Sequence, residues 1–88
     1  MPAPSKTKLP KDDGGTSFRV RTGTARKEGG GEDFTYDRYP TSRAAIAAAK
    51  PEKRTTIIDI EQLHSHTWLL LRRWVPGKGW KTVAKEVS

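Results

Sequence analysis

The three tryptophans of the chain, Trp68, Trp74 and Trp80, all lie within residues 67–87. This segment is predicted to form two strands, because Pro and Gly residues at positions 76–79 mark a chain reversal between two alternating stretches. The largest apolar groups and a cluster of positive charge therefore share one hairpin. Aromatic rings interleaved with Arg and Lys can close a small core or bind a polyanion, and both uses stay open here.

Two further strands are expected before this hairpin. In residues 18–24, Phe, Val and Thr alternate with Arg19 and Arg21, which is the period of a strand with one apolar and one polar face. Three consecutive glycines at positions 29–31 let the chain reverse. Residues 34–39 then form a second strand that pairs back as a hairpin.

A short helix follows at residues 43–50, which consist mainly of alanine. Thr41 or Ser42 supplies the N-cap, and Pro51 ends the helix because it disfavours the α conformation of the residue before it. Such a short helix needs packing to be stable. The side chains expected to hold it against the sheet are Ala45, Ile46 and Ala49.

A third strand is expected at residues 55–63, with Ile58 and Ile60 on one face and Asp59 and Glu61 on the other. The predicted order is strand, strand, helix, strand, strand, strand. We therefore predict an α+β fold, an antiparallel sheet of about five strands with one short Ala-rich helix on one face.

The chain has 88 residues, which is enough for one small domain. Residues 1–17, with three prolines and two glycines, are expected to be a disordered tail, and residues 18–88 a single domain. There is no cysteine, no secretory signal and no apolar run long enough to span a bilayer, so we expect a cytoplasmic protein with no membrane association.

The net charge of +7 favours an anionic partner, either nucleic acid or an acidic protein surface. Positive charge is concentrated in the first strand and the last hairpin, and acidic residues lie between them. If these two elements are neighbours in the sheet, their basic side chains converge to neutralise phosphates. These side chains are Arg19, Arg21, Arg72, Arg73 and Lys81.

Simple alternation gives the fourth strand two different faces. One face carries Leu69, Leu71, Arg73 and Val75, and the other carries Trp68, Leu70, Arg72 and Trp74. The aliphatic set suits contact with an Ala-rich helix, which leaves the tryptophans on the open face beside an arginine. Exposed tryptophans there could stack on unpaired bases, whereas a covered face would make the same rings part of the core.

No catalytic, cofactor or metal site is predicted. His64 and His66 could share a metal with Asp59 or Glu61, but no third ligand occurs at a recognisable spacing. The two glycines around Lys78 are too close together for a phosphate loop, and no serine lies in a nucleophile motif. We therefore expect no enzyme activity and no small-molecule substrate.

The joint between the second strand and the helix, FTYDRYPTSRAAI at residues 34–46, resembles strand-to-helix joints of small phage and mobile-element proteins. It is also similar to the arm-type DNA-binding domain of tyrosine recombinases, a three-stranded sheet backed by a helix. That resemblance implies DNA binding. This chain departs from the pattern because two or three strands follow its helix.

The sequence thus predicts a small basic accessory module that binds nucleic acid, DNA or RNA, through a basic and aromatic sheet face. The alternative is an accessory or inhibitor protein, of phage or mobile-element origin, that docks on an acidic surface of a larger partner. The residues expected to bind nucleic acid are Arg19, Arg21, Trp68, Arg72, Arg73, Trp74 and Lys81.

Overall fold

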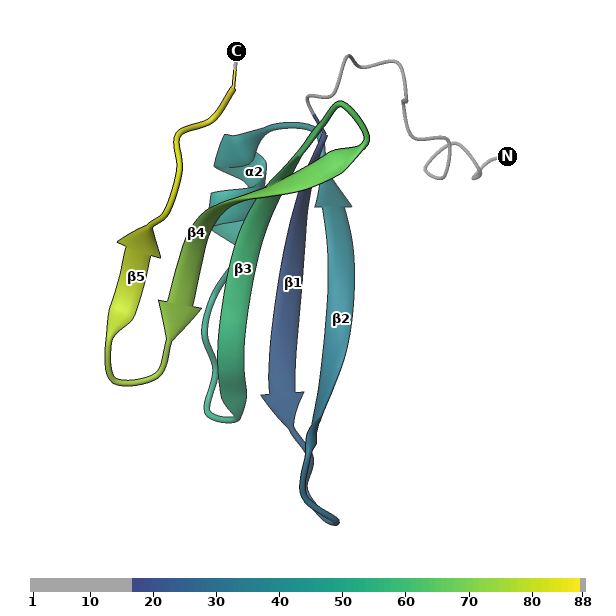
Figure 1. Ribbon diagram of the computed structural model, residues 1–88. Helices are drawn as coiled ribbons and strands as arrows, with labels where there is room; N and C mark the ends of the chain where they lie inside the picture. Colours follow the sequence, from purple (N-terminus) through teal and green to yellow (C-terminus); the bar gives the residue numbers. More distant parts are fainter. Residues whose placement is uncertain (1–16, 88) are drawn as a thin grey trace.

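The computed structural model describes residues 17–87, which form an antiparallel sheet of five strands with one short helix on one side (Figure 1). The elements are β1 (Phe18–Ala25), β2 (Glu32–Tyr39), α2 (Ser42–Ala48), β3 (Thr55–His64), β4 (Thr67–Val75) and β5 (Gly79–Thr82). The predicted α+β fold and its order of elements are confirmed. The expected tail lies outside the described residues except for Ser17, whose carbonyl accepts a hydrogen bond from the Leu63 N–H at 2.9 Å.

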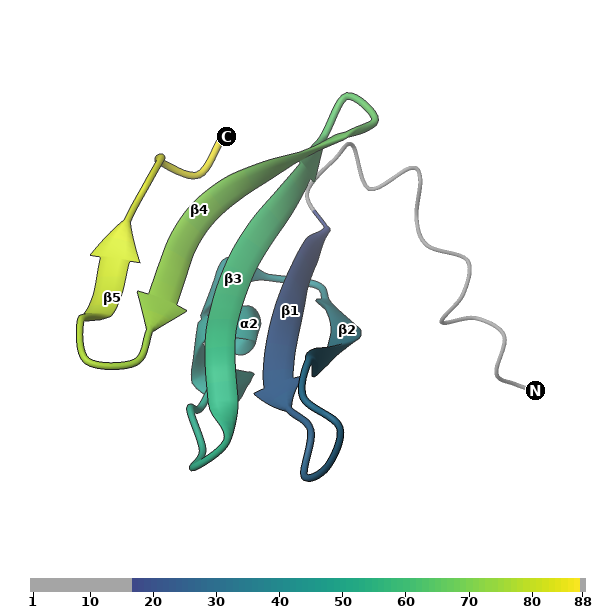
Figure 2. The ribbon, with the colours of Figure 1, turned by 60° about the horizontal axis from the view of Figure 1, so that its bottom comes forward.

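The strands lie in the spatial order β2-β1-β3-β4-β5, so β3 is the central strand. β1 and β2 form one hairpin, and β3, β4 and β5 form a meander of consecutive hairpins (Figures 1 and 2). The two groups join where β1 pairs with β3. The first strand and the last hairpin are therefore not neighbours, because β3 separates them.

Alternating apolar residues of β1 and β3 form the centre of the core, as their periodicity predicts. Val20 lies opposite Ile60 in the sheet, and Thr22 lies opposite Ile58. Directly opposed residues project from the same face, so these side chains share the helix side of the sheet. The buried apolar residues are Phe18, Val20, Ala45, Ala49, Ile58, Ile60 and Leu71, and Tyr39, Leu69 and Trp74 pack against them.

The helix begins after Thr41, whose side-chain oxygen accepts a hydrogen bond from the Ala44 N–H at 3.1 Å. Ala45 and Ala49 are buried, as predicted, and their small side chains let α2 approach the sheet closely. Ile46 is 39% exposed, so the expectation that it packs into the core was wrong. It follows Ala45 by one position, about 100° around the helix, and lies at the edge of the helix–sheet contact, where it lines a cavity with Ile60 and Leu71.

A β-bulge in β4 reverses the expected alternation of its side chains. Ile60 lies opposite Arg72 and Glu61 lies opposite Leu70, so Leu71 is an extra residue in the pairing. Leu69 and Leu71 face the helix side and Trp68 faces away from it, as predicted, but beyond the bulge the faces are exchanged. The predicted faces of Arg72, Arg73, Trp74 and Val75 were therefore wrong.

The turn between β4 and β5 fixes a register that the sequence leaves open. Gly77 and Gly79 both have positive φ, which glycine adopts without strain, and the Lys78 N–H donates to the Val75 carbonyl at 3.0 Å. Trp80 consequently lies opposite Trp74 rather than Val75.

Candidate functional site

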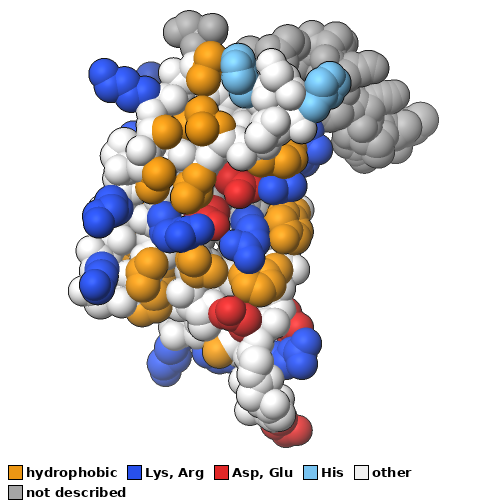
Figure 3. Space-filling model, viewed as in Figure 1, with side chains coloured by type: hydrophobic (Ala, Val, Ile, Leu, Met, Phe, Trp, Pro, Cys, Tyr) orange, Lys and Arg blue, Asp and Glu red, His pale blue; other side chains and the backbone are white. Residues whose placement is uncertain are grey.

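The face of the sheet opposite α2 gathers charged and aromatic side chains from all five strands, and we call it the open face (Figure 3). Within residues 17–87, no helix covers it (Figures 1 and 2). Acidic side chains lie near its centre, with basic and apolar ones around them. Its principal side chains are Phe34, Tyr36, Arg38, Arg19, Arg21, Asp59, Glu61, Trp68, Leu70, Arg73 and Lys81.

Asp59 is the centre of an ion-pair network on this face. Its side chain is only 2% exposed, and the sheet register places Arg21 on one side of it and Arg73 on the other. Arg21 Nη1 donates to Oδ2 at 3.1 Å, while Arg73 Nε donates to Oδ1 at 2.7 Å and Arg73 Nη2 to Oδ2 at 3.1 Å. A carboxylate that accepts three charge-assisted hydrogen bonds is well compensated for its burial.

Two further contacts extend the network. Glu61 Oε1 accepts from Arg19 Nε at 2.8 Å and lies 2.7 Å from Arg19 Nη2. Arg21 Nε donates to the Tyr36 hydroxyl at 3.3 Å; this bond first, and the Asp59 charge after it, raise the pKa of Arg21. The hydrogen bonds to Asp59 likewise raise the pKa of Arg73. Both guanidinium groups therefore stay charged over the whole neutral range.

Aromatic rings and guanidinium groups alternate across the open face. Arg19 Cζ lies 4.1 Å from the ring centroid of Trp68 and 4.8 Å from that of Tyr36, and Arg38 Cζ lies 4.8 Å from the Trp68 centroid. These distances are those of cation–π contacts. We call Tyr36, Arg19, Trp68 and Arg38 the aromatic–arginine stack. Tyr36 is 52% exposed, so the stack presents a ring as well as guanidinium planes to solvent.

The predicted binding residues are divided between the two sides of the sheet. Arg19, Arg21, Trp68, Arg73 and Lys81 lie on the open face. Because of the bulge, the other two predicted residues, Arg72 and Trp74, lie on the helix side. The expected convergence of arginines occurs only around Asp59 and Glu61, and these acids pair with three of them.

Three open-face residues of β2 were missed by the sequence reasoning, namely Phe34, Tyr36 and Arg38. Their spacing of two within a predicted strand was the available signal, since residues at that spacing share a face. Alternation within residues 34–39 does not by itself show which face of the strand is open. The register of β2 with β1 places the three side chains on the same face as Arg19 and Arg21.

Gly23 lets the Phe34 ring lie close to the sheet, where Arg21 Cζ is 4.1 Å from its centroid. A Cβ at position 23 would lie 2.9 Å from Phe34 Cε1, 2.7 Å from Thr56 Oγ1 and 3.0 Å from Ile57 Cγ2. We expect Gly23→Ala to lower the free energy of unfolding by about 1–3 kcal/mol, because these groups must move apart. Urea denaturation measures the change. The same substitution in a Phe34→Ala background should cost less, and an equal cost would contradict the role given to the ring.

Residues 17–87 bring no three His, Asp or Glu side chains together in a group suited to a metal ion. The helix in this part of the chain is not long and apolar enough to cross a membrane.

The open face thus combines an exposed aromatic–arginine stack with an internal ion-pair network that holds the arginines in place.

Comparison of the chain with protein-family models, with curated proteins and with solved structures finds no match.

Proposed function

We propose that the open face binds single-stranded nucleic acid. The observation that carries this proposal is the aromatic–arginine stack, in which rings and guanidinium planes alternate on an exposed sheet face. Unpaired bases stack on both kinds of plane, and stacking tolerates any base sequence. A single strand suits this face better than a duplex, because reading a major groove requires a protruding helix or ribbon and α2 lies on the other side of the sheet.

The distribution of charge indicates how the strand would lie. Arg38 on β2 and Lys81 on β5 have no ion-pair partner within residues 17–87, whereas Asp59 and Glu61 neutralise the centre of the face. Phosphates would therefore contact the two sides of the face, and bases would lie over its centre. β2 and β5 are four strand spacings apart, about 19 Å. The nucleic-acid chain would therefore run across the β-strands, from one edge of the sheet to the other.

Fluorescence anisotropy with a labelled single-stranded oligonucleotide tests this proposal. We expect binding at low salt that weakens as salt rises, with a slope of about 0.7 for each phosphate contact. A duplex of the same length should compete poorly. A folded protein that binds no oligonucleotide at low salt would contradict the proposal and favour the alternative partner, an acidic protein surface, for which exposed Tyr, Trp and Arg side chains are also suited.

A matched pair of charge reversals locates the binding face. Arg38→Glu should weaken oligonucleotide binding about tenfold and reduce the salt slope by about 0.7, the value of one phosphate contact. Arg43→Glu makes the same charge change on α2, behind the sheet, and should leave the affinity within about twofold. Equal losses in both variants would show attraction by net charge alone and would contradict a site on the open face.

A further inference from the structure

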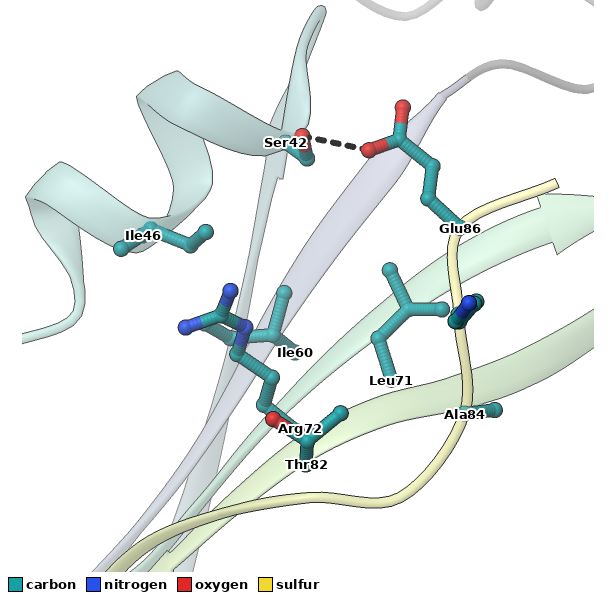
Figure 4. Close-up of a pocket in the computed structure, with 9 residues that line it drawn as sticks. Ser42, Ile46, Ile60, Leu71, Arg72, Thr82, Ala84 and Glu86 are labelled. Carbon is teal, nitrogen blue, oxygen red and sulfur yellow. Dashed lines mark hydrogen bonds between the residues drawn. The ribbon is translucent and has the colours of Figure 1, made fainter. Parts of the chain in front are cut away.

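A cavity of about 380 Å³ lies on the other side of the sheet, between α2, β4 and the C-terminal segment (Figure 4). Its floor is apolar and is formed by the buried side chains of Ile60 and Leu71. Ile46 of α2 forms one wall, and Arg72 extends from β4 toward that wall (Figure 4). Lys85, in the segment after β5, also lines the cavity.

The cavity exists because the helix is short and covers only part of the sheet. α2 contacts β1, β2 and β3, and it leaves the helix side of β4 to the segment after β5. The N–H groups of Val83 and Ala84 donate to the Leu71 carbonyl at 2.7 and 3.2 Å. The beginning of this segment is therefore hydrogen-bonded to the bulge residue of β4. Its far end is held where Ser42 Oγ donates to Glu86 Oε1 at 2.8 Å (Figure 4).

A buried amide secures the same segment. The Gln62 side chain donates through Nε2 to the Val87 carbonyl at 2.9 Å and accepts through Oε1 from the Val87 N–H at 2.8 Å. Gln62 is fully buried, so both bonds form away from water. The wall of the cavity is thus anchored at both of its ends.

The bulge gives this cavity its charge. With uninterrupted alternation Arg72 would lie on the open face with Asp59 and Glu61, but the extra residue Leu71 turns it to the helix side. Asp59 is paired by Arg73 instead. Within residues 17–87 Arg72 has no acidic partner, although its side chain lies over an apolar floor.

We propose that this cavity binds a small organic carboxylate with an apolar body, a site separate from the one on the open face. The guanidinium fork of Arg72 matches the two oxygens of a carboxylate, and Lys85 adds a second positive charge. Ile46, Ile60 and Leu71 would contact the apolar body. Glu86 at the rim disfavours a second negative charge, so a singly charged carboxylate fits better than a phosphate monoester.

The test is a titration of the ¹⁵N-labelled protein with octanoate, followed by NMR, with octanol as the uncharged control. We expect saturable shifts at the amides of Ile46, Leu71 and Arg72. Octanol should bind at least about tenfold more weakly than octanoate, which corresponds to one charge-assisted hydrogen-bonded pair. No saturable shift at millimolar octanoate, or equal affinity for octanol, would overturn the proposal.

Substitutions separate this site from the open face. Arg72→Gln should weaken octanoate binding at least about tenfold, and Arg72→Lys, which keeps the charge and loses the fork, should give an intermediate value. Arg38→Gln should leave octanoate binding unchanged and weaken oligonucleotide binding instead. An unchanged octanoate affinity in Arg72→Gln would overturn the proposal, as would shifts confined to the open face. Arg72 is exposed, so the variant should fold, and its NMR spectrum verifies this.

Discussion

Asp59→Asn is expected to lower the free energy of unfolding by about 2–4 kcal/mol. The substitution keeps the size of the side chain but removes the charge that compensates Arg21 and Arg73. Asparagine also offers one acceptor oxygen where the carboxylate offers two. Part of the cost is relieved because both guanidinium groups keep some contact with water. For a domain of this size, whose total stability is about 5–15 kcal/mol, the loss is large.

Urea denaturation measures this change, and the same substitution at an exposed pair provides the control. Asp33 accepts from Arg26 Nε at 2.9 Å, but the two side chains are 66% and 53% exposed. Asp33→Asn should therefore cost less than about 0.5 kcal/mol. Similar losses at positions 59 and 33 would show that the central network contributes no more than a surface ion pair.

Trp68→Ala is expected to weaken oligonucleotide binding by about 10- to 100-fold, the equivalent of one or two stacked bases. This expectation rests on the proposed function. Trp68 contacts both Arg19 and Arg38, so its removal deletes a stacking surface and releases two guanidinium groups. Anisotropy titration measures the loss, and circular dichroism verifies that the variant is folded.

Trp80→Ala is the matched control for this experiment. Trp80 is 41% exposed, but it lies opposite Trp74 on the helix side of the edge strand β5. Its removal should change the affinity by less than about twofold, because the register places it on the helix side whereas the aromatic–arginine stack lies on the open face. A loss as large as that of Trp68→Ala would place the binding surface at the β5 edge instead.

Local patterns predicted the elements of this fold because their causes are local. Alternation located the strands, and the apolar faces of β1 and β3 form the core as expected. The Thr41 cap and the end of α2 before Pro51 follow from short-range hydrogen bonding and sterics. The polar face of β3, with Asp59 and Glu61, was also predicted correctly.

The features that were missed depend on how distant segments pair. A bulge is one extra residue in a register, and alternation within β4 gives no sign that Leu71 is that residue. The faces of Arg72 and Trp74 were therefore wrong. The position of β3 between β1 and β4 brings Asp59 between two arginines that the charge pattern alone would leave unpaired.

The junction of β1 with β3 also has a consequence for how the chain folds. Arg73 and Asp59 are 14 residues apart in the chain, but Arg21 and Asp59 are 38 apart. Closing the longer loop costs more chain entropy, so the two hairpin groups should form first and the junction last. Asp59→Asn should then give an intermediate φ-value, because its bonds with Arg73 lie within the group that forms first and its bond with Arg21 crosses the junction. The Arg21–Asp59 ion pair therefore forms only when the two hairpin groups join, and its loss should mainly accelerate unfolding.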